Sequence, residues 1–372
     1  MSNIKKRDAN LDLLRIFSML MIIFLHSIDH SGVLEQAEHS SPAMYFYVRF
    51  AYALCQVCVN CYVMLSGYYL VNSTFRLQKL AALWMETVFY AFILKLLFMV
   101  TGQEQLSILS LISCFFPILT GRYWFITIYV GLYLVSPFLN KLIHAMNKKE
   151  YTMLNICLFV LFSLWSSIHP AIAGMNSGGG WGLAWFVVLY LVAAWFRLYY
   201  TPKHNPALLF GVFFLIPLLI AAGQLAANAA GIGVLQTIIN HWFRYDSAPA
   251  YLMTMALFAA FLNLKLENEH VSKAICSVAP LTLGVYLIHA HANVSPWLWA
   301  SLNLPAKMDS ASFPLVQLGC VLAIFIVCIA ADALRKSTVG RLEQCRFTYS
   351  ACSSITSRIN TFVQSISVED EK

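Results

Sequence analysis

The sequence contains few charged residues. Asp, Glu, Lys and Arg make up 11% of its 372 residues, whereas they make up about 25% of an average soluble globular protein. Hydrophobic residues account for 60% of the chain, and the mean hydropathy is +0.69. This scarcity of charge excludes a soluble globular protein and indicates a membrane protein.

Signatures of several other protein classes are missing. No small-residue cleavage site follows the apolar N-terminal run, so we expect a retained helix there and not a secretory signal. The chain shows no Gly-rich phosphate loop, no basic-aromatic array and no zinc-ligand spacing, so the net charge of +7 needs no nucleic-acid partner and no metal site is predicted. The stretch GMNSGGGWG at 174–182 lacks the strand-to-helix setting of a nucleotide fingerprint and is expected to be a flexible outer loop.

The cysteines do not form the pattern of a disulfide framework. Ten are present, but most lie within apolar runs and not in exposed loops. The series CQVCVNC at 55–61 has the spacing of three that one face of a helix produces. We therefore expect Cys55, Cys58 and Cys61 to be core thiols.

Apolar stretches of about 20 residues recur along the chain, each long enough to cross a hydrocarbon core of about 30 Å. A shorter, serine-bearing piece at 106–119 contains Pro117 and is predicted to be re-entrant or interfacial. The predicted fold is an all-α polytopic membrane protein, with residues 1–335 as its transmembrane domain and 336–372 as a polar tail. About ten transmembrane helices are expected, near 9–28, 43–71, 81–101, 122–146, 151–170, 182–200, 206–228, 248–266, 277–292 and 313–334.

The distribution of Lys and Arg predicts the orientation of these helices. Loops on the cytoplasmic side of a membrane protein carry the excess of basic residues. With ten crossings and both termini inside, most of the basic residues fall in inner segments, and only Arg122, Arg244 and Lys307 fall in outer ones. We therefore predict that both termini and the tail are cytoplasmic.

The first apolar run, DLLRIFSMLMIIFLHSI at 12–28, contains ionisable residues. Arg at the centre of a membrane helix costs about 3 kcal/mol. Arg15 and His26 are three helical turns plus about 20° apart, so they share one face, about 16 Å apart along the axis. Asp12 lies one turn before Arg15, where it can form an ion pair. This face is predicted to be functional; the alternative is that Arg15 snorkels and His26 marks an interface.

The end of the second predicted helix and the loop after it also carry candidate site residues. Ser66 lies near the inner end of that helix, in VMLSGYYL, and Arg76 and Lys79 follow in the first inner loop. Two basic residues one turn apart can bind phosphate groups. The alternative is that they are ordinary cytoplasmic anchors.

Further candidates lie elsewhere in the chain. Tyr286 and His289 are one turn apart in TLGVYLIHAHAN at 282–293, where a histidine is more often a hydrogen-bonded structural group. Glu86 and Arg49 lie within predicted helices and are possible partners of Arg15 or of a substrate.

Together these segments resemble the acyltransferase-3 family, the bacterial surface-glycan O-acyltransferases, including those that act on enterobacterial common antigen. Arg15 and His26 match the family's signature of an Arg, ten intervening residues and a His in the first helix. VMLSGYYL, the first inner loop, WFITIYVGLYLVSPFLN and LGVYLIH extend the resemblance over most of the chain. Lys79 stands where the family usually has a second arginine, and it lacks that residue's bidentate fork.

The resemblance implies transfer of an acyl group, acetyl in the first instance, from acyl-CoA to a cell-surface glycan or its lipid-linked precursor. It implies a multi-pass protein of the bacterial inner membrane, with His26 as general base and Arg15, Arg76 and Lys79 as contacts for the donor. Asp12, Ser66, Tyr286, His289 and Glu86 are expected in supporting or substrate-binding roles. No permanently bound cofactor is expected, and the oligomeric state stays open.

Two other functions fit the same residues. A secondary transporter or flippase would use Asp12, Arg15 and His26 as an intramembrane relay. A non-catalytic partner in glycan assembly would neither consume acyl-CoA nor move a substrate.

Overall fold

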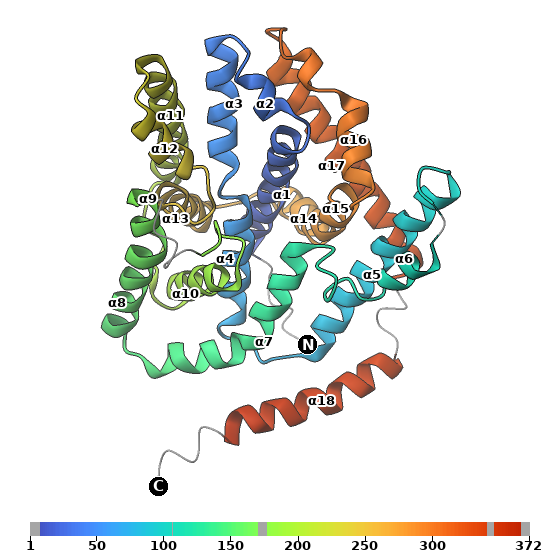
Figure 1. Cartoon of the computed structure of the whole chain (residues 1–372). Coiled ribbons are helices and arrows are strands. Elements are labelled where there is room, and N and C mark those ends of the chain that lie inside the picture. Colours follow the sequence, from blue (N-terminus) through green and yellow to red (C-terminus); the bar gives the residue numbers. More distant parts are fainter. Residues whose placement is uncertain (1–7, 106, 170–176, 341–345, 366–372) are drawn as a thin grey trace.

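A computed structural model describes residues 8–105, 107–169, 177–340 and 346–365, and the regular elements within these ranges are all helices (Figure 1). Among them, eight spans are long and apolar enough to cross a membrane. They are α1 (Ala9–Asp29), α3 to α4 (Pro42–Leu70), α5 (Leu77–Val100), α7 (Trp124–Ala145), α8 to α9 (Lys148–Ile168), α11 (Pro206–Ala230), α14 to α15 (Glu269–His289) and α17 (Phe313–Thr338). Two shorter apolar helices, α10 (Leu183–Tyr199) and α13 (Ala248–Asn263), occupy the two remaining predicted positions. The predicted all-α polytopic membrane fold is confirmed.

Helix α1 lies inside the bundle (Figure 1). It contacts α3 (Pro42–Cys55), α4 (Cys58–Leu70), α13, α14 (Glu269–Val278), α15 (Thr282–His289) and α17. In its most apolar window 61% of the residues are buried, against 22% to 33% for the outer spans from α5 onward. Asp12, Arg15 and His26 of α1 are therefore surrounded mainly by protein.

The span predicted at 43–71 is broken in the middle. Helix α3 ends at Cys55 and α4 begins at Cys58, and together they form the single span Pro42–Leu70 that the sequence predicts near 43–71. The break lets the two halves follow different partners, because α3 packs on α11 and α4 packs on α10. Cys55, Cys58 and Cys61 are buried free thiols, as the sequence predicts.

Helix α4 approaches α10 more closely than most side chains would allow. A Cβ atom at Gly67 would lie 2.8 Å from the carbonyl oxygen of Tyr190. The two helices therefore pack backbone against backbone at this glycine. This contact fixes the position of α4, whose side chains line the site described below.

The remaining helices are short or lie beside the bundle. The predicted re-entrant piece contains only α6 (Ile108–Ser113), which is too short to cross a membrane; Leu106 lies outside the described residues. Helix α18 (Arg346–Ser365) packs along α5, where Thr356 accepts a hydrogen bond from the Leu77 N–H. Other short pieces are α2 (Val33–Ala37), α12 (Gly233–His241), α16 (Val294–Leu302), the π-helical turn between α8 (Lys148–Phe159) and α9 (Trp165–Ile168), and 3-10 turns at Ala279–Leu281 and Pro305–Lys307.

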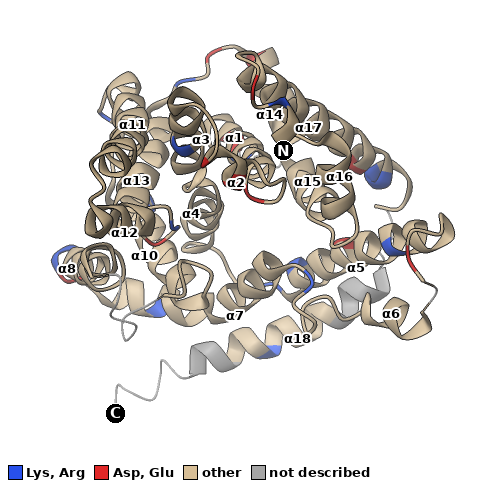
Figure 2. Ribbon diagram, turned by 45° about the horizontal axis from the view of Figure 1, so that its top comes forward, with Lys and Arg blue, Asp and Glu red and all other residues tan. Residues whose placement is uncertain are grey.

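Charged residues are sparse along the ribbons, and most of those drawn lie at helix ends and in connections (Figure 2). This pattern is typical of helices that meet lipid along most of their length. The orientation with both termini in the cytoplasm, and the division at residue 335, stay predictions.

Candidate functional site

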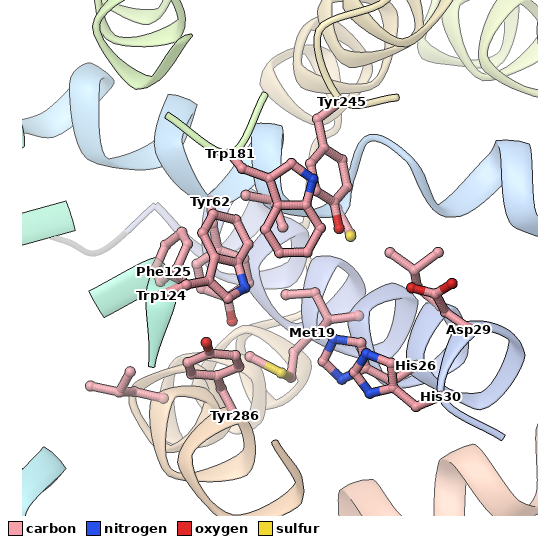
Figure 3. A pocket seen from close by; sticks show the side chains of 15 residues that line it. Met19, His26, Asp29, His30, Tyr62, Trp124, Phe125, Trp181, Tyr245 and Tyr286 are labelled. Atoms are coloured by element: carbon pink, nitrogen blue, oxygen red, sulfur yellow. The ribbon is translucent and has the colours of Figure 1, made fainter. Parts of the chain in front are cut away.

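Two cavities lie along α1, one at each of its predicted site residues. The lining of the His26 cavity includes His26, Asp29, His30, Tyr62, Trp124, Trp181, Tyr245 and Tyr286 (Figure 3). The lining of the Arg15 cavity includes Arg15, Ser66, Lys79, Tyr129 and Tyr133. Tyr62, Phe125 and Leu283 belong to both linings, so the two cavities share a wall.

His26 is paired with His289, from a helix more than 250 residues further along the chain. His26 Nδ1 lies 3.0 Å from His289 Nε2, and His289 Nδ1 lies 2.6 Å from the carbonyl oxygen of Val285. A carbonyl oxygen only accepts hydrogen bonds, so His289 carries its proton on Nδ1. In the neutral pair, His289 Nε2 therefore accepts from the His26 Nδ1–H, and His26 Nε2 keeps a free lone pair. Histidine with this tautomer is suited to accept a proton at the cavity.

Two more ring-bearing side chains, His30 and Tyr286, lie beside the His26–His289 pair. The His30 ring stacks on the His26 ring, with ring centroids 4.4 Å apart. Burial lowers the pKa of His30, and the Asp29 carboxylate opposes this shift. Tyr286 lines the same cavity, and its ring centroid lies 6.3 Å from that of His289. The structure thus brings together His26, Tyr286 and His289, three residues selected from two distant segments of sequence.

Arg15 forms the ion pair that the helical spacing predicts. Its Nη1 lies 2.7 Å from Asp12 Oδ1, and the two side chains are 25% and 6% exposed. Lys79 lines the same cavity from α5, and Ser66 lines it from α4, where its hydroxyl donates to the Tyr62 carbonyl oxygen at 3.1 Å. The Arg15 cavity therefore carries two positive charges, one of them partly neutralised and oriented by Asp12.

Arg76 lies beside this cavity and does not line it. Its side chain is exposed, and its backbone N–H donates to the Tyr133 hydroxyl at 3.0 Å while its carbonyl oxygen accepts from the same hydroxyl at 3.1 Å. The sequence placed Arg76 and Lys79 together as one basic pair. The two residues remain one turn apart, but Lys79 lies within α5 and lines the cavity, whereas Arg76 precedes the helix.

Glu86 and Arg49 form ion pairs with residues other than Arg15, and their contact with a substrate stays a prediction. Glu86 forms an ion pair with Arg335 at 2.9 Å, in a cluster where Arg335 also bonds to Asp332 at 2.7 Å. Arg49 forms an ion pair with Glu38. Each charge is satisfied by a neighbour from another segment, which spacing along one helix does not reveal.

Sequence reasoning missed most of the aromatic lining of the His26 cavity. Trp124 begins α7, in the segment WFITIYVGLYLVSPFLN, and neither it nor Tyr245 was singled out as a site residue. Trp181 lies in the glycine-rich segment that was expected to be flexible. In the described part of that segment, Gly180 packs against Tyr245; residues 174–176 lie outside the described residues.

The site thus combines an oriented histidine in an aromatic cavity with a neighbouring cationic cavity. An acyltransferase-domain family model, Acyl_transf_3, matches residues 8–332, which include both cavities. No curated protein and no solved structure gives a significant match to the chain.

Proposed function

The chain belongs to the acyltransferase-3 family of membrane proteins, and from this membership we propose that it transfers an acetyl group from acetyl-CoA to a hydroxyl of a cell-surface glycan or its lipid-linked precursor. The observation that carries the proposal is the His26–His289 pair in a cavity that shares a wall with the cavity of Arg15 and Lys79. A base and a cationic binding region are the two parts that this reaction needs. We assign the protein to the bacterial inner membrane on the same basis.

In this mechanism the reaction takes place at His26. The acceptor hydroxyl gives its proton to His26 Nε2 as its oxygen attacks the thioester carbonyl carbon. A C–O bond forms, the C–S bond breaks, and the leaving thiolate takes the proton back from His26. His289 acts through His26: its Nε2 accepts the His26 Nδ1–H at 3.0 Å and so holds the ring in the tautomer of a base.

The donor occupies the other cavity. Arg15 and Lys79 provide positive charges for its phosphates, and Asp12 fixes the orientation of the guanidinium. An extended pantetheine arm spans the distance of about 16 Å from Arg15 to His26. The arm runs past Tyr62, Phe125 and Leu283, which line both cavities. The thioester thus reaches His26 while the phosphates stay at Arg15 and Lys79. Arg76, exposed outside the lining, adds long-range attraction for the donor.

Replacement of His26 tests the assignment of the base. His26→Ala is expected to lower the rate of transfer from labelled acetyl-CoA about 10²- to 10⁴-fold, the usual contribution of a general base. His144→Ala is the matched control, because His144 is exposed and bonds to a backbone oxygen of its own helix. Full activity of His26→Ala at a normal membrane level would contradict the mechanism.

Charge removal tests the donor site. Lys79→Ala is expected to raise the KM for acetyl-CoA with little effect on kcat, because it removes a charge remote from the reacting atoms. Arg76→Ala should have a smaller effect that high salt removes, since the side chain is exposed. Lys149→Ala, an exposed lysine on α8, is the control. An unchanged KM for Lys79→Ala would contradict the donor assignment.

A transporter is the second candidate, because Arg15, which is paired with Asp12, and His26 line two adjoining cavities. Reconstituted vesicles separate the two functions. Transport moves substrate without consuming acetyl-CoA, whereas transfer releases coenzyme A in a His26-dependent manner.

A further inference from the structure

Three aromatic side chains form a continuous surface across the His26 cavity from His26 (Figure 3). The ring centroids of Trp124 and Trp181 are 4.4 Å apart, those of Trp181 and Tyr245 are 5.7 Å apart, and the Trp124 and Tyr245 rings are stacked within 15° of parallel. We call Trp124, Trp181 and Tyr245 the aromatic wall. They come from α7 and from the loops before α10 and α13, so the fold assembles the wall from three separate segments.

The aromatic wall gives this side of the cavity an apolar lining. Tyr245 is buried and Trp124 is half-buried, but Trp181 is 49% exposed although it lines the cavity. An indole in this position offers a large, rigid contact surface to whatever occupies the cavity. The side of the cavity nearest His26 is polar, with Asp29 and His30 in its lining.

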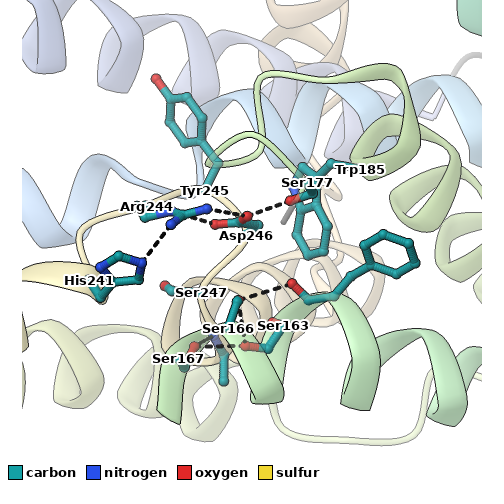
Figure 4. Close-up of polar contacts among 12 residues, drawn as sticks. Ser163, Ser166, Ser167, Ser177, Trp185, His241, Arg244, Tyr245, Asp246 and Ser247 are labelled. Carbon is teal, nitrogen blue, oxygen red and sulfur yellow. Dashed lines mark hydrogen bonds and ion pairs between the residues drawn. The ribbon is translucent and has the colours of Figure 1, made fainter. Parts of the chain in front are cut away.

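A buried polar network fixes the two loops that carry Trp181 and Tyr245 (Figure 4). Asp246, 1% exposed, accepts hydrogen bonds from Arg244 Nε and Nη2 at 3.0 and 2.9 Å and from the Ser177 hydroxyl. Arg244 Nη1 lies 2.7 Å from His241 Nε2, and burial and the nearby guanidinium lower the pKa of His241, which keeps this nitrogen an acceptor. The network joins the loop before α10 to the loop before α13.

Glycine allows the two loops to touch. Gly178, Gly179 and Gly180 all have positive φ, between 69° and 89°, which favours glycine. A Cβ atom at Gly180 would lie 2.5 Å from the Tyr245 Cβ. Gly180, the residue before Trp181, thus packs directly against Tyr245. The aromatic wall is preorganised, which lowers the entropic cost of binding.

We propose that the aromatic wall is the acceptor subsite and that it binds a pyranose ring. A pyranose has a flat face of C–H groups, which packs on an indole, and an edge of hydroxyls, which hydrogen-bonds to carboxylate and imidazole groups. The cavity offers both: the apolar indole of Trp181 on one side, and Asp29 and His30 beside His26 on the other. Stacked on the wall, the ring directs a hydroxyl toward His26. This inference rests on the proposed function, because it takes the occupant of the cavity to be the acceptor.

Binding and transfer are measured separately with defined probes. Methyl glycosides of glucose, galactose, mannose and N-acetylglucosamine serve as acceptors, with 1-octanol as an apolar alcohol. Saturable quenching of tryptophan fluorescence in the purified protein reports binding without acetyl-CoA. Transfer of labelled acetyl groups and release of coenzyme A report the chemistry.

Trp181→Ala is expected to raise the concentration of glycoside needed for half-maximal binding and transfer at least tenfold. Trp181→Phe should retain most of the affinity, because a smaller ring still stacks. Trp297→Ala is the matched control: Trp297 is 51% exposed, lies on α16 and packs on Phe98 outside the cavity. Gly180→Ala should reproduce the Trp181→Ala phenotype, because the added methyl group displaces the loop.

Three results would overturn the inference. They are unchanged glycoside affinity in Trp181→Ala, the absence of saturable quenching by any glycoside in the wild type, and acetylation of 1-octanol in preference to every glycoside. Failure of the proposed function looks different: glycosides then quench the fluorescence through Trp181, but no His26-dependent release of coenzyme A occurs.

Discussion

The hydrogen bond between His26 and His289 makes a quantitative prediction. Substitution of His289 by Leu fills the space with an apolar side chain but removes the acceptor for the His26 Nδ1–H. In the wild type this acceptor, His289 Nε2, lies 3.0 Å from His26 Nδ1. A buried donor without a partner costs about 1–3 kcal/mol. If the active tautomer of His26 is less stable by this free energy in the variant, kcat falls about 5- to 150-fold. KM values should change little, because His289 contacts neither substrate in the proposed mechanism.

Steady-state transfer assays on the purified protein, with kcat and KM resolved for both substrates, measure this effect. His289→Gln is the informative second variant, because a glutamine oxygen can accept the same hydrogen bond and should restore much of kcat. Thermal unfolding in detergent shows whether each variant is folded. A folded His289→Leu protein with kcat within twofold of wild type would refute the positioning role, and so would a His289→Gln protein as impaired as His289→Leu.

Three further predictions concern stability, and thermal or denaturant unfolding in detergent checks each of them. Gly67→Ala should destabilise the protein by about 1–3 kcal/mol, since the new Cβ would lie 2.8 Å from a backbone oxygen of α10; an unchanged midpoint would show that the helices separate easily. Asp332→Ala should cost about 3 kcal/mol, because it removes an acceptor from Arg335, which is 3% exposed. The exposed Asp309→Ala should have no such effect. Burial lowers the pKa of His291 to about 4, below its value of 6.5 in the unfolded chain. Its contribution to stability is therefore complete above pH 6.5 and falls by about 1.4 kcal/mol per pH unit as the pH drops toward 4. His291→Gln should weaken this acid destabilisation, and an identical pH dependence would contradict the shift.

Local properties of the chain determined the helices and part of the site. The hydrocarbon core sets the length of an apolar run, so composition alone located the helices, including the two shorter ones, α10 and α13. Helical periodicity is equally local. It placed Asp12 one turn from Arg15, and the ion pair at 2.7 Å confirms that placement. The break between α3 and α4 was missed because it serves contacts with two other helices.

Only the tertiary structure decided the contacts between segments that lie far apart in the sequence. Nothing in the first helix indicates that His26 meets His289, or that Glu86 meets Arg335 and not Arg15. Trp181 and Tyr245 become neighbours because Gly180 and Asp246 join two loops that are separate in the sequence. The sequence by itself thus determined a helical membrane protein with an ionisable face on α1. Packing decided which partners that face meets, because a side chain's partner depends on how the helices are arranged and not on spacing within one of them.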